Sequence, residues 1–189
     1  MKSLEEKIIK EGKVLPGNIL KVDGFLNHRM DVAFINEMGK EFKRLFKDEK
    51  VDKILTVEAS GIGIACITAQ YFGVPVLFAK KAKAKNIGGD VYKAEIMSFT
   101  KGTPTEIFVN KAYLSEGEKI LIIDDFLAIG NAFLGLKNIC DQAKAEIVGC
   151  GICIEKVFQG GGDKIRSMGI KLESLAKISA MTDSSIEFI

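Results

Sequence analysis

Unbroken apolar runs recur along the middle of this chain. Residues 53–57, 74–79, 120–124 and 146–154 are rich in Ile, Leu, Val and Cys and do not alternate strictly with polar residues. Short runs of this kind are typical of strands buried on both faces, as in the centre of a parallel sheet. The pattern therefore predicts at least four buried strands.

Helical patterns fall between these runs. Asp31 is placed to cap a helix whose apolar residues share one face. A small-residue loop at 58–63 leads into a helix that runs to about residue 72, and a loop with Gly130 leads into a helix over 131–143. A short helix near 163–168 and a strand over 171–178 follow. Because strands alternate with helices, we predict the α/β class with a mostly parallel, doubly wound sheet.

The chain length favours one domain. At 189 residues it is long enough for a substantial core. We predict a single domain over 1–189, with a sheet core at about 51–154 and a small hood formed by about 1–50 and 155–189. Within the first hood segment, residues 14–27 are irregular and punctuated by Pro and Gly, which suits a lid.

The composition argues against nucleic acid and membranes as partners. The 27 basic and 25 acidic residues give a net charge of +2, so the chain lacks the excess of basic residues that is typical of nucleic-acid-binding proteins. No apolar run approaches the roughly 20 residues of a membrane span, and the N-terminus lacks a signal-peptide core. We therefore expect a cytoplasmic protein that binds neither nucleic acid nor a membrane.

The cysteines and the histidine point to no metal site. All four cysteines lie in apolar surroundings and read as reduced, buried residues. Cys150 and Cys153 form a CxxC, but their odd separation on a strand should direct the thiols to opposite faces. His28 is the only histidine, so no protein metal cage is expected.

The stretch 119–132 carries the clearest chemistry. Asp124 and Asp125 follow an apolar run, and a loop with Gly130 then leads into a helix. Adjacent carboxylates need donors, which ribose hydroxyls supply, while a helix N-terminus binds phosphate. The pattern predicts a ribose 5-phosphate site at the carboxyl edge of the sheet. The plainer alternative is a strand end with Asp as a turn or cap residue.

This stretch, IDDFLAIGNA, resembles the phosphoribosyl diphosphate (PRPP) signature of the type I phosphoribosyltransferases. Residues 58–61 stand where that family has its diphosphate loop, and Lys80 and Lys81 stand where it has basic residues on the diphosphate. Taken alone, these two segments also fit an ordinary strand–helix turn and a solvated lysine cluster.

The resemblance extends over nearly the whole chain. Residues 19–28, 58–61 and 154–156, together with IDDFLA, resemble the members of this family that use xanthine in bacteria. This implies transfer of ribose 5-phosphate from PRPP to N9 of xanthine, giving XMP and diphosphate. It also implies a homodimer, and Mg²⁺ carried by PRPP rather than by a protein cage.

The resemblance assigns roles to individual residues. It implies ribose-facing catalytic acids at Asp124 and Asp125. It places xanthine on Leu20, Asn27 and Lys156. It places the 5-phosphate on Ala128, Ile129, Gly130, Asn131 and Ala132. It places the diphosphate on Glu58, Ala59, Ser60, Gly61, Lys80 and Lys81.

Two positions depart from the family pattern. Most relatives have Asn or Thr where this chain has Ile129, so backbone N–H groups and the helix dipole must hold the phosphate here. Residues 98–103 resemble the flexible catalytic loop, but Thr100 stands where adenine-using members have Glu. No general acid is therefore carried over to this loop.

Three alternatives remain open. The base could be guanine or hypoxanthine, because a lysine at 156 only donates hydrogen bonds and so favours an oxo group over the amino group of adenine. A PRPP-sensing regulator shares the fold, although 189 residues and a charge of +2 leave little room for DNA binding. A phosphatase or receiver-type protein would leave residues 20–28 and 58–61 unexplained.

Overall fold

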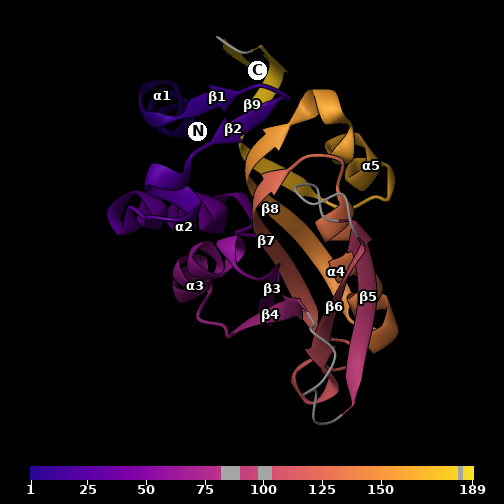
Figure 1. Ribbon diagram of the computed structural model, residues 1–189. Helices are drawn as coiled ribbons and strands as arrows, with labels where there is room; N and C mark the ends of the chain where they lie inside the picture. The colour runs from indigo at the N-terminus through magenta and orange to yellow at the C-terminus, as the bar shows by residue number, and fades with distance from the viewer. Residues whose placement is uncertain (82–89, 98–103, 183–184) are drawn as a thin grey trace.

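The structure is a computed structural model that describes residues 1–81, 90–97, 104–182 and 185–189 (Figure 1). Its centre is a sheet of eight strands in the order β10-β9-β8-β7-β3-β4-β6-β5. The strands are β3 (Lys53–Val57), β4 (Val76–Lys81), β5 (Val91–Met97), β6 (Pro104–Asn110), β7 (Lys119–Leu127), β8 (Glu146–Lys156), β9 (Leu172–Met181) and β10 (Ile186–Phe188). The five from β9 to β4 are parallel, and the others join antiparallel. The predicted mostly parallel sheet is confirmed.

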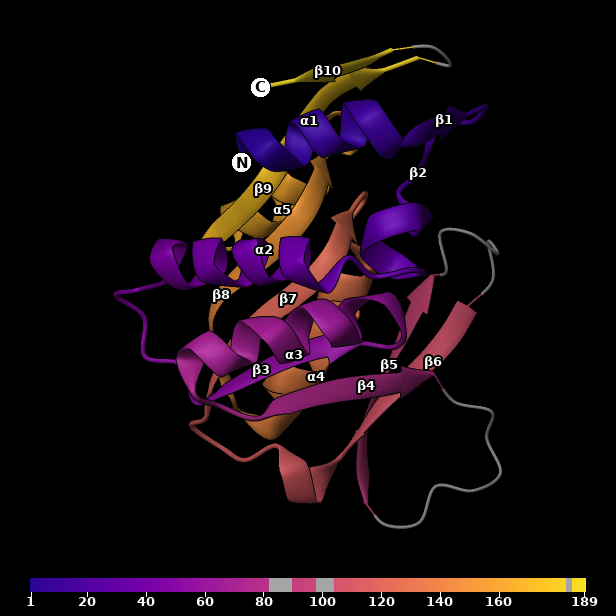
Figure 2. The same cartoon turned by 90° about the vertical axis from the view of Figure 1, so that its left-hand side faces the viewer.

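Helices cover both faces of this sheet (Figure 2). α2 (Val32–Leu45) and α3 (Ser60–Phe72) lie on one face, and α4 (Asn131–Ala143) and α5 (Gly161–Ser167) lie on the other. Strand β7 supplies both layers, since Leu121 and Ile123 pack toward α2 and α3 while Ile120 and Ile122 pack toward α4. This alternation is why β7 is apolar at every position from Ile120 to Ile123. Among the described residues, none of the helices has the length and apolar character needed to cross a bilayer.

β7 is longer than its sequence indicated. We expected the strand to end at Asp124, but its ladder with β8 continues to the pair Leu127–Glu155. On its other side the ladder with β3 stops at the pair Leu55–Ile122. The long β8 partner extends β7, and the short β3 leaves the acid pair without a strand neighbour on one side. That one-sided edge is where the site forms.

The terminal segments differ from the predicted hood. Residues 14–27 are not irregular throughout, because β1 (Lys13–Leu15) and β2 (Ile19–Lys21) form a hairpin followed by a single π-helical turn, η1 (Asp23–Asn27). In the C-terminal segment, β9 and β10 extend the main sheet instead of folding over it. α1 (Lys2–Glu11) packs against β9, next to the hairpin (Figure 1).

Two smaller predictions concern a helix cap and the cysteines. Asp31 caps α2, since its carboxylate accepts a hydrogen bond from the Phe34 N–H at 3.1 Å. Cys150 and Cys153 lie in the two separate core layers, as their spacing predicted. The expectation of four buried cysteines was wrong for Cys66, which is exposed on α3 because its helical position faces away from the sheet.

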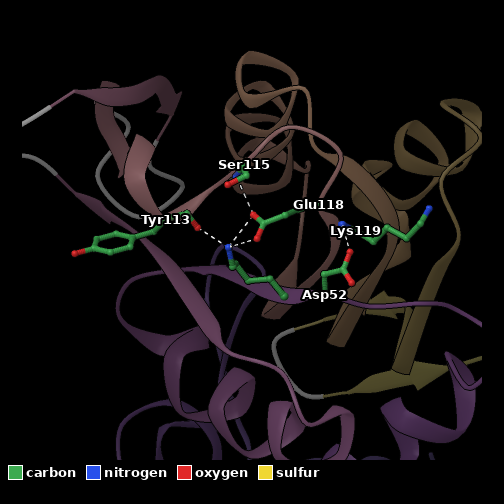
Figure 3. Close-up of polar contacts among 6 residues, drawn as sticks. Asp52, Tyr113, Ser115, Glu118 and Lys119 are labelled. Carbon is green, nitrogen blue, oxygen red and sulfur yellow. Dashed lines mark hydrogen bonds and ion pairs between the residues drawn. The ribbon is translucent and has the colours of Figure 1, made fainter.

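Polar contacts hold the opposite edge of the sheet, where β3 and β7 begin (Figure 3). The Lys53 ammonium donates to both Glu118 carboxylate oxygens at 2.7 and 2.8 Å and to the Tyr113 carbonyl. The Lys119 N–H donates to Asp52 at 3.0 Å. These contacts fix the start of β7 against β3, and so help to set the register that places the acid pair at the far end.

Candidate active site

A pocket of about 1000 Å³ opens at the carboxyl ends of β3, β7 and β8. It is the kind of crevice in which α/β sheets bind ligands. The predicted site residues that line it are Leu20, Asn27, Glu58, Ser60, Lys81, Asp124, Asp125, Ala128, Ile129, Gly130, Asn131, Ala132 and Lys156. Ala59, Gly61 and Lys80 are not part of the lining. Segments far apart in sequence therefore meet here, as the resemblance implied.

The acid pair lies at the floor of this pocket. Asp124 and Asp125 are each only 7% exposed. Asp124 accepts from the Asp125 N–H at 2.9 Å, and Asp125 accepts from the Phe126 N–H at 3.0 Å. Burial, with the adjacent Asp125 carboxylate, holds the pKa of Asp124 well above its ordinary 3.8. A ligand that brings hydroxyl donors or positive charge would relieve this desolvation.

Asp125 has an additional partner from the N-terminal segment. The Asn27 side-chain amide, at the end of η1, donates to the second Asp125 oxygen at 2.8 Å. This contact closes the pocket between the hairpin segment and β7. Among the described residues, Asp125 accepts from the Asn27 amide and the Phe126 N–H, whereas Asp124 accepts from the Asp125 N–H, so the two neighbouring acids differ in environment.

The 58–61 loop packs directly beside Asp124. A Cβ added to Gly61 would lie 2.1 Å from the Thr56 hydroxyl oxygen and 3.0 Å from Oδ1 of Asp124, so only glycine fits. The Glu58–Ala59 peptide is cis. Glu58 accepts from the Lys81 N–H at 2.5 Å, which joins this loop to β4. Gly61 thus serves close packing rather than lining the pocket.

Lys80 and Lys81, the last two residues of β4, point in different directions. Lys81 lines the pocket, whereas the Lys80 ammonium lies 6.0 Å from the Phe78 ring and outside the lining. Both residues belong to β4 rather than following it, and successive strand residues point to opposite faces. The structure therefore brings one of the two predicted lysines to the site.

The loop 128–132 enters α4 with a left-handed residue. Gly130 is the N-cap of α4 at φ +88°, and no side chain caps the helix. The first N–H groups of the helix are thus available to a ligand. Ile129 is 39% exposed and brings no polar side chain, as its sequence indicated. The loop has the features of an anion site built from backbone.

Leu20, Phe126 and Lys156 form a less polar part of the pocket lining. Leu20 is 6% exposed, and the Lys156 ammonium lies 5.6 Å from the centre of the Phe126 ring. Lys156 donates to the Asn18 carbonyl at 2.7 Å, and burial lowers the pKa of its ammonium from 10.5. Leu20, Phe126 and Lys156 together offer apolar contacts and one cationic donor to a flat, polar ring.

Several lining residues were not predicted. They are Gly17, Ile19, Val57, Ile96, Met97, Thr105, Ile122, Leu127, Phe133, Cys150 and Ile152 in addition to Phe126. Phe126 lies in sequence between the predicted Asp125 and the predicted loop 128–132, and this position was a usable signal. The predicted catalytic loop, 98–103, lies outside the described residues. Among the described residues, no three His, Cys, Asp or Glu side chains are grouped to hold a metal.

Comparisons with known proteins agree with this geometry. Residues 31–171 match the family model of the phosphoribosyl transferase domain. The chain is 54% identical to a xanthine phosphoribosyltransferase of Clostridioides difficile and 51% identical to one of Bifidobacterium adolescentis, covering 100% of this chain and at least 99% of each relative. This chain belongs to the phosphoribosyltransferase family.

Solved structures share the fold at low identity. An adenine phosphoribosyltransferase of Giardia lamblia in complex with 9-deazaadenine has a TM-score of 0.79 at 22% identity, over 91% of this chain and 96% of that one. One from Thermoanaerobacter pseudethanolicus has a TM-score of 0.75 at 20% identity, over 92% and 99%. The predicted type I phosphoribosyltransferase fold is confirmed.

Proposed function

We propose that this protein transfers ribose 5-phosphate from PRPP to N9 of xanthine, releasing diphosphate and forming XMP. The observation that carries the proposal is one pocket that holds a desolvated acid pair, a backbone anion loop three residues downstream, and a buried lysine from β8. The full-length relatives at more than 50% identity are named for xanthine, which supports this choice of base.

The ribose 5-phosphate would span the acid pair and the loop. In our proposal the phosphate binds the N–H groups of 128–132, and the ribose hydroxyls donate to Asp124 and Asp125. As the bond from C1 to the diphosphate breaks, positive charge develops on the ribose ring. Two carboxylates held in a poorly solvated floor stabilise that charge more strongly than they would in water.

The leaving diphosphate would face the 58–61 loop and Lys81. Ser60 begins α3, so the loop offers a hydroxyl and helix N–H groups, while Lys81 adds a positive charge. Mg²⁺ bound to PRPP would neutralise part of the diphosphate charge. Among the described residues no three carboxylate, thiol or imidazole groups are clustered to hold a metal, so the ion would be held mainly by PRPP oxygens and water.

The base would occupy the end lined by Leu20 and Phe126. Lys156 has only donors to offer and so suits an oxo group of xanthine, while Asn27 offers a donor and an acceptor. Because both side chains make protein contacts in this structure, base binding must exchange or share the Lys156–Asn18 and Asn27–Asp125 hydrogen bonds.

We further infer a homodimer acting in the cytoplasm. The four cysteines are all free thiols, which suits a reducing compartment. Light scattering on the purified full chain measures the oligomeric state directly, and a monomeric mass would contradict the dimer.

A base panel tests the proposed function. Purified protein with PRPP and Mg²⁺ is offered xanthine, guanine, hypoxanthine and adenine, and nucleotide formation is followed for each. We expect the highest kcat/KM with xanthine and the lowest with adenine. Equal use of all four bases, or PRPP binding without transfer to any of them, would contradict the proposal.

A further inference from the structure

Three consecutive glycines, Gly160, Gly161 and Gly162, precede α5 and play no part in the proposed chemistry. Each is required for a different reason. Gly160 has φ +75°, a left-handed conformation that side chains disfavour. Gly161 and Gly162 leave no room for a Cβ, which would lie 2.2 Å from the Ala128 carbonyl oxygen and 1.8 Å from Glu155 Oε1, respectively.

Gly161 packs directly on the loop assigned to the 5-phosphate. Its N–H donates to the Ala128 carbonyl at 3.0 Å, and an added Cβ would also lie 2.9 Å from the Gly130 nitrogen. One turn later on α5, the Lys164 ammonium lies 3.3 Å from the Ile129 carbonyl and donates to it. Two successive carbonyls of the loop are therefore directed toward α5.

These contacts determine where the N–H groups of the loop point. In a trans peptide the N–H of the next residue is directed opposite to the carbonyl. With the Ala128 and Ile129 carbonyls turned to α5, the N–H groups of Ile129 and Gly130 are turned away from it. Within the described part of the chain, neither N–H donates a hydrogen bond to the protein. Both remain available to a ligand in the pocket that this loop lines.

α5 is itself fixed to the sheet by a buried cluster. Glu155 on β8 is 0% exposed and receives two hydrogen bonds from Arg166 of α5, both at 2.9 Å. It also accepts from the Ser174 hydroxyl on β9 at 2.5 Å. A paired, bidentate contact of this kind gives a defined geometry. The helix therefore cannot slide along the loop without breaking that cluster.

We propose that α5 positions the phosphate loop, with Gly161 and Lys164 acting as positioning residues that orient the Ala128–Ile129 and Ile129–Gly130 peptides for the 5-phosphate. The inference rests on the proposed function, since it takes 128–132 as the phosphate loop. It explains how a loop with Ile129 in place of a hydrogen-bonding side chain keeps its donors aligned.

Two ligands that each carry part of PRPP separate this role from general damage. Ribose 5-phosphate carries the ribose with its 5-phosphate but no diphosphate, and inorganic diphosphate carries only the leaving group. We measure the affinity of the full-length protein for each by calorimetry. Gly161→Ala should weaken the affinity for ribose 5-phosphate by about tenfold, which corresponds to the loss of one hydrogen bond to a charged group. The affinity for diphosphate should stay within about twofold of the wild-type value.

Lys164 provides a milder test that does not disturb packing. Lys164→Met should weaken ribose 5-phosphate about two- to fivefold, because an exposed charged contact contributes modestly, and Lys164→Arg should restore it. The KM for PRPP should rise in parallel, with little change in the KM for xanthine.

Gly149→Ala is the matched control. Its Cβ would lie 2.4 Å from the Phe46 ring, so it crowds the core without touching the loop. It should lower the melting temperature yet keep both affinities. If Gly161→Ala and Lys164→Met change neither ligand, or weaken both equally, the positioning role is overturned. If the wild-type protein binds diphosphate but not ribose 5-phosphate, the phosphate assignment itself fails.

Discussion

The Asn27 amide donates to Asp125 at 2.8 Å across 98 positions of sequence. This contact joins the N-terminal π-helical turn to the central strand at the acid pair. Asp125 also keeps its hydrogen bond from the Phe126 N–H. Asp125 therefore remains oriented when Asn27 is replaced, and the replacement should weaken mainly the binding of the base.

Asn27→Ala should lower kcat/KM for xanthine by about ten- to a hundredfold, since a lost buried partner costs roughly 1–3 kcal/mol. The affinity for PRPP should change much less. Asn36→Ala is a suitable control, because Asn36 accepts from the Tyr71 hydroxyl at 2.6 Å between α2 and α3, away from the pocket. Equal losses for xanthine and PRPP would move base recognition to other residues.

The ionised form of Asp124 should lower the free energy of unfolding of the ligand-free protein. The pKa of Asp124 is raised in the folded state, mainly by burial. Its contribution to the free energy of unfolding is therefore fully present at pH below 3.8 and is lost as pH rises through the folded pKa. Asp124→Asn removes that loss. The variant should have a higher free energy of unfolding than the wild type at pH 8.

Urea unfolding at pH 8 and pH 5 checks this prediction. The advantage of Asp124→Asn should shrink toward pH 5, while transfer activity is lost at both values. The Asn side-chain oxygen can still accept from the Asp125 N–H, so the local backbone should be kept. A variant less stable than the wild type at pH 8 would contradict the assigned desolvation.

Lys156 should make xanthine binding weaker at high pH. Burial lowers the pKa of its ammonium from 10.5, so it loses its proton at a pH below that of an exposed lysine. Affinity for xanthine should therefore fall as pH rises toward that lowered pKa, with PRPP affinity nearly constant. Lys156→Gln should be weaker throughout and lack this pH dependence. An identical pH profile in wild type and variant would exclude Lys156 from the base site.

Gly130→Val tests the anion loop. Gly130 has φ +88°, where a β-branched residue is strained by about 1–3 kcal/mol, so PRPP affinity should fall at least about tenfold. Gly117→Val is matched to it, because Gly117 has φ +78° and open space where a Cβ would lie, in a turn before β7. The control should lose stability and keep its PRPP affinity. Equal PRPP affinities in both variants would place the phosphate elsewhere.

Local patterns predicted much of this fold and site. The apolar runs located β3, β4, β7 and β8, and the small-residue loops located the starts of α3 and α4. The motif around Asp124 and the segment near Leu20 predicted part of the pocket lining, namely Leu20, Asn27, Asp124, Asp125 and residues 128–132. These features depend on near neighbours in sequence, on burial at every position of a strand, and on glycine where the backbone turns sharply.

What was missed depends on partners distant in sequence. β7 runs past Asp124 because β8 is long, and the acids are open on one side because β3 is short. Lys80 was misplaced because β4 includes both lysines and so sends them to opposite faces. The packing role of Gly161 and Gly162 was not predicted, since their close contacts are with Ala128 and Glu155, which no local pattern connects to them.

The most direct test of the account measures product stoichiometry with the acid pair removed. Wild-type protein is incubated with PRPP, Mg²⁺ and xanthine, and XMP and diphosphate are quantified together, alongside Asp124→Asn combined with Asp125→Asn. We predict equal amounts of the two products from the wild type and none above background from a double variant that retains its folded circular dichroism and melting transition. Absence of XMP from the wild type, or undiminished turnover by the folded double variant, would contradict the account.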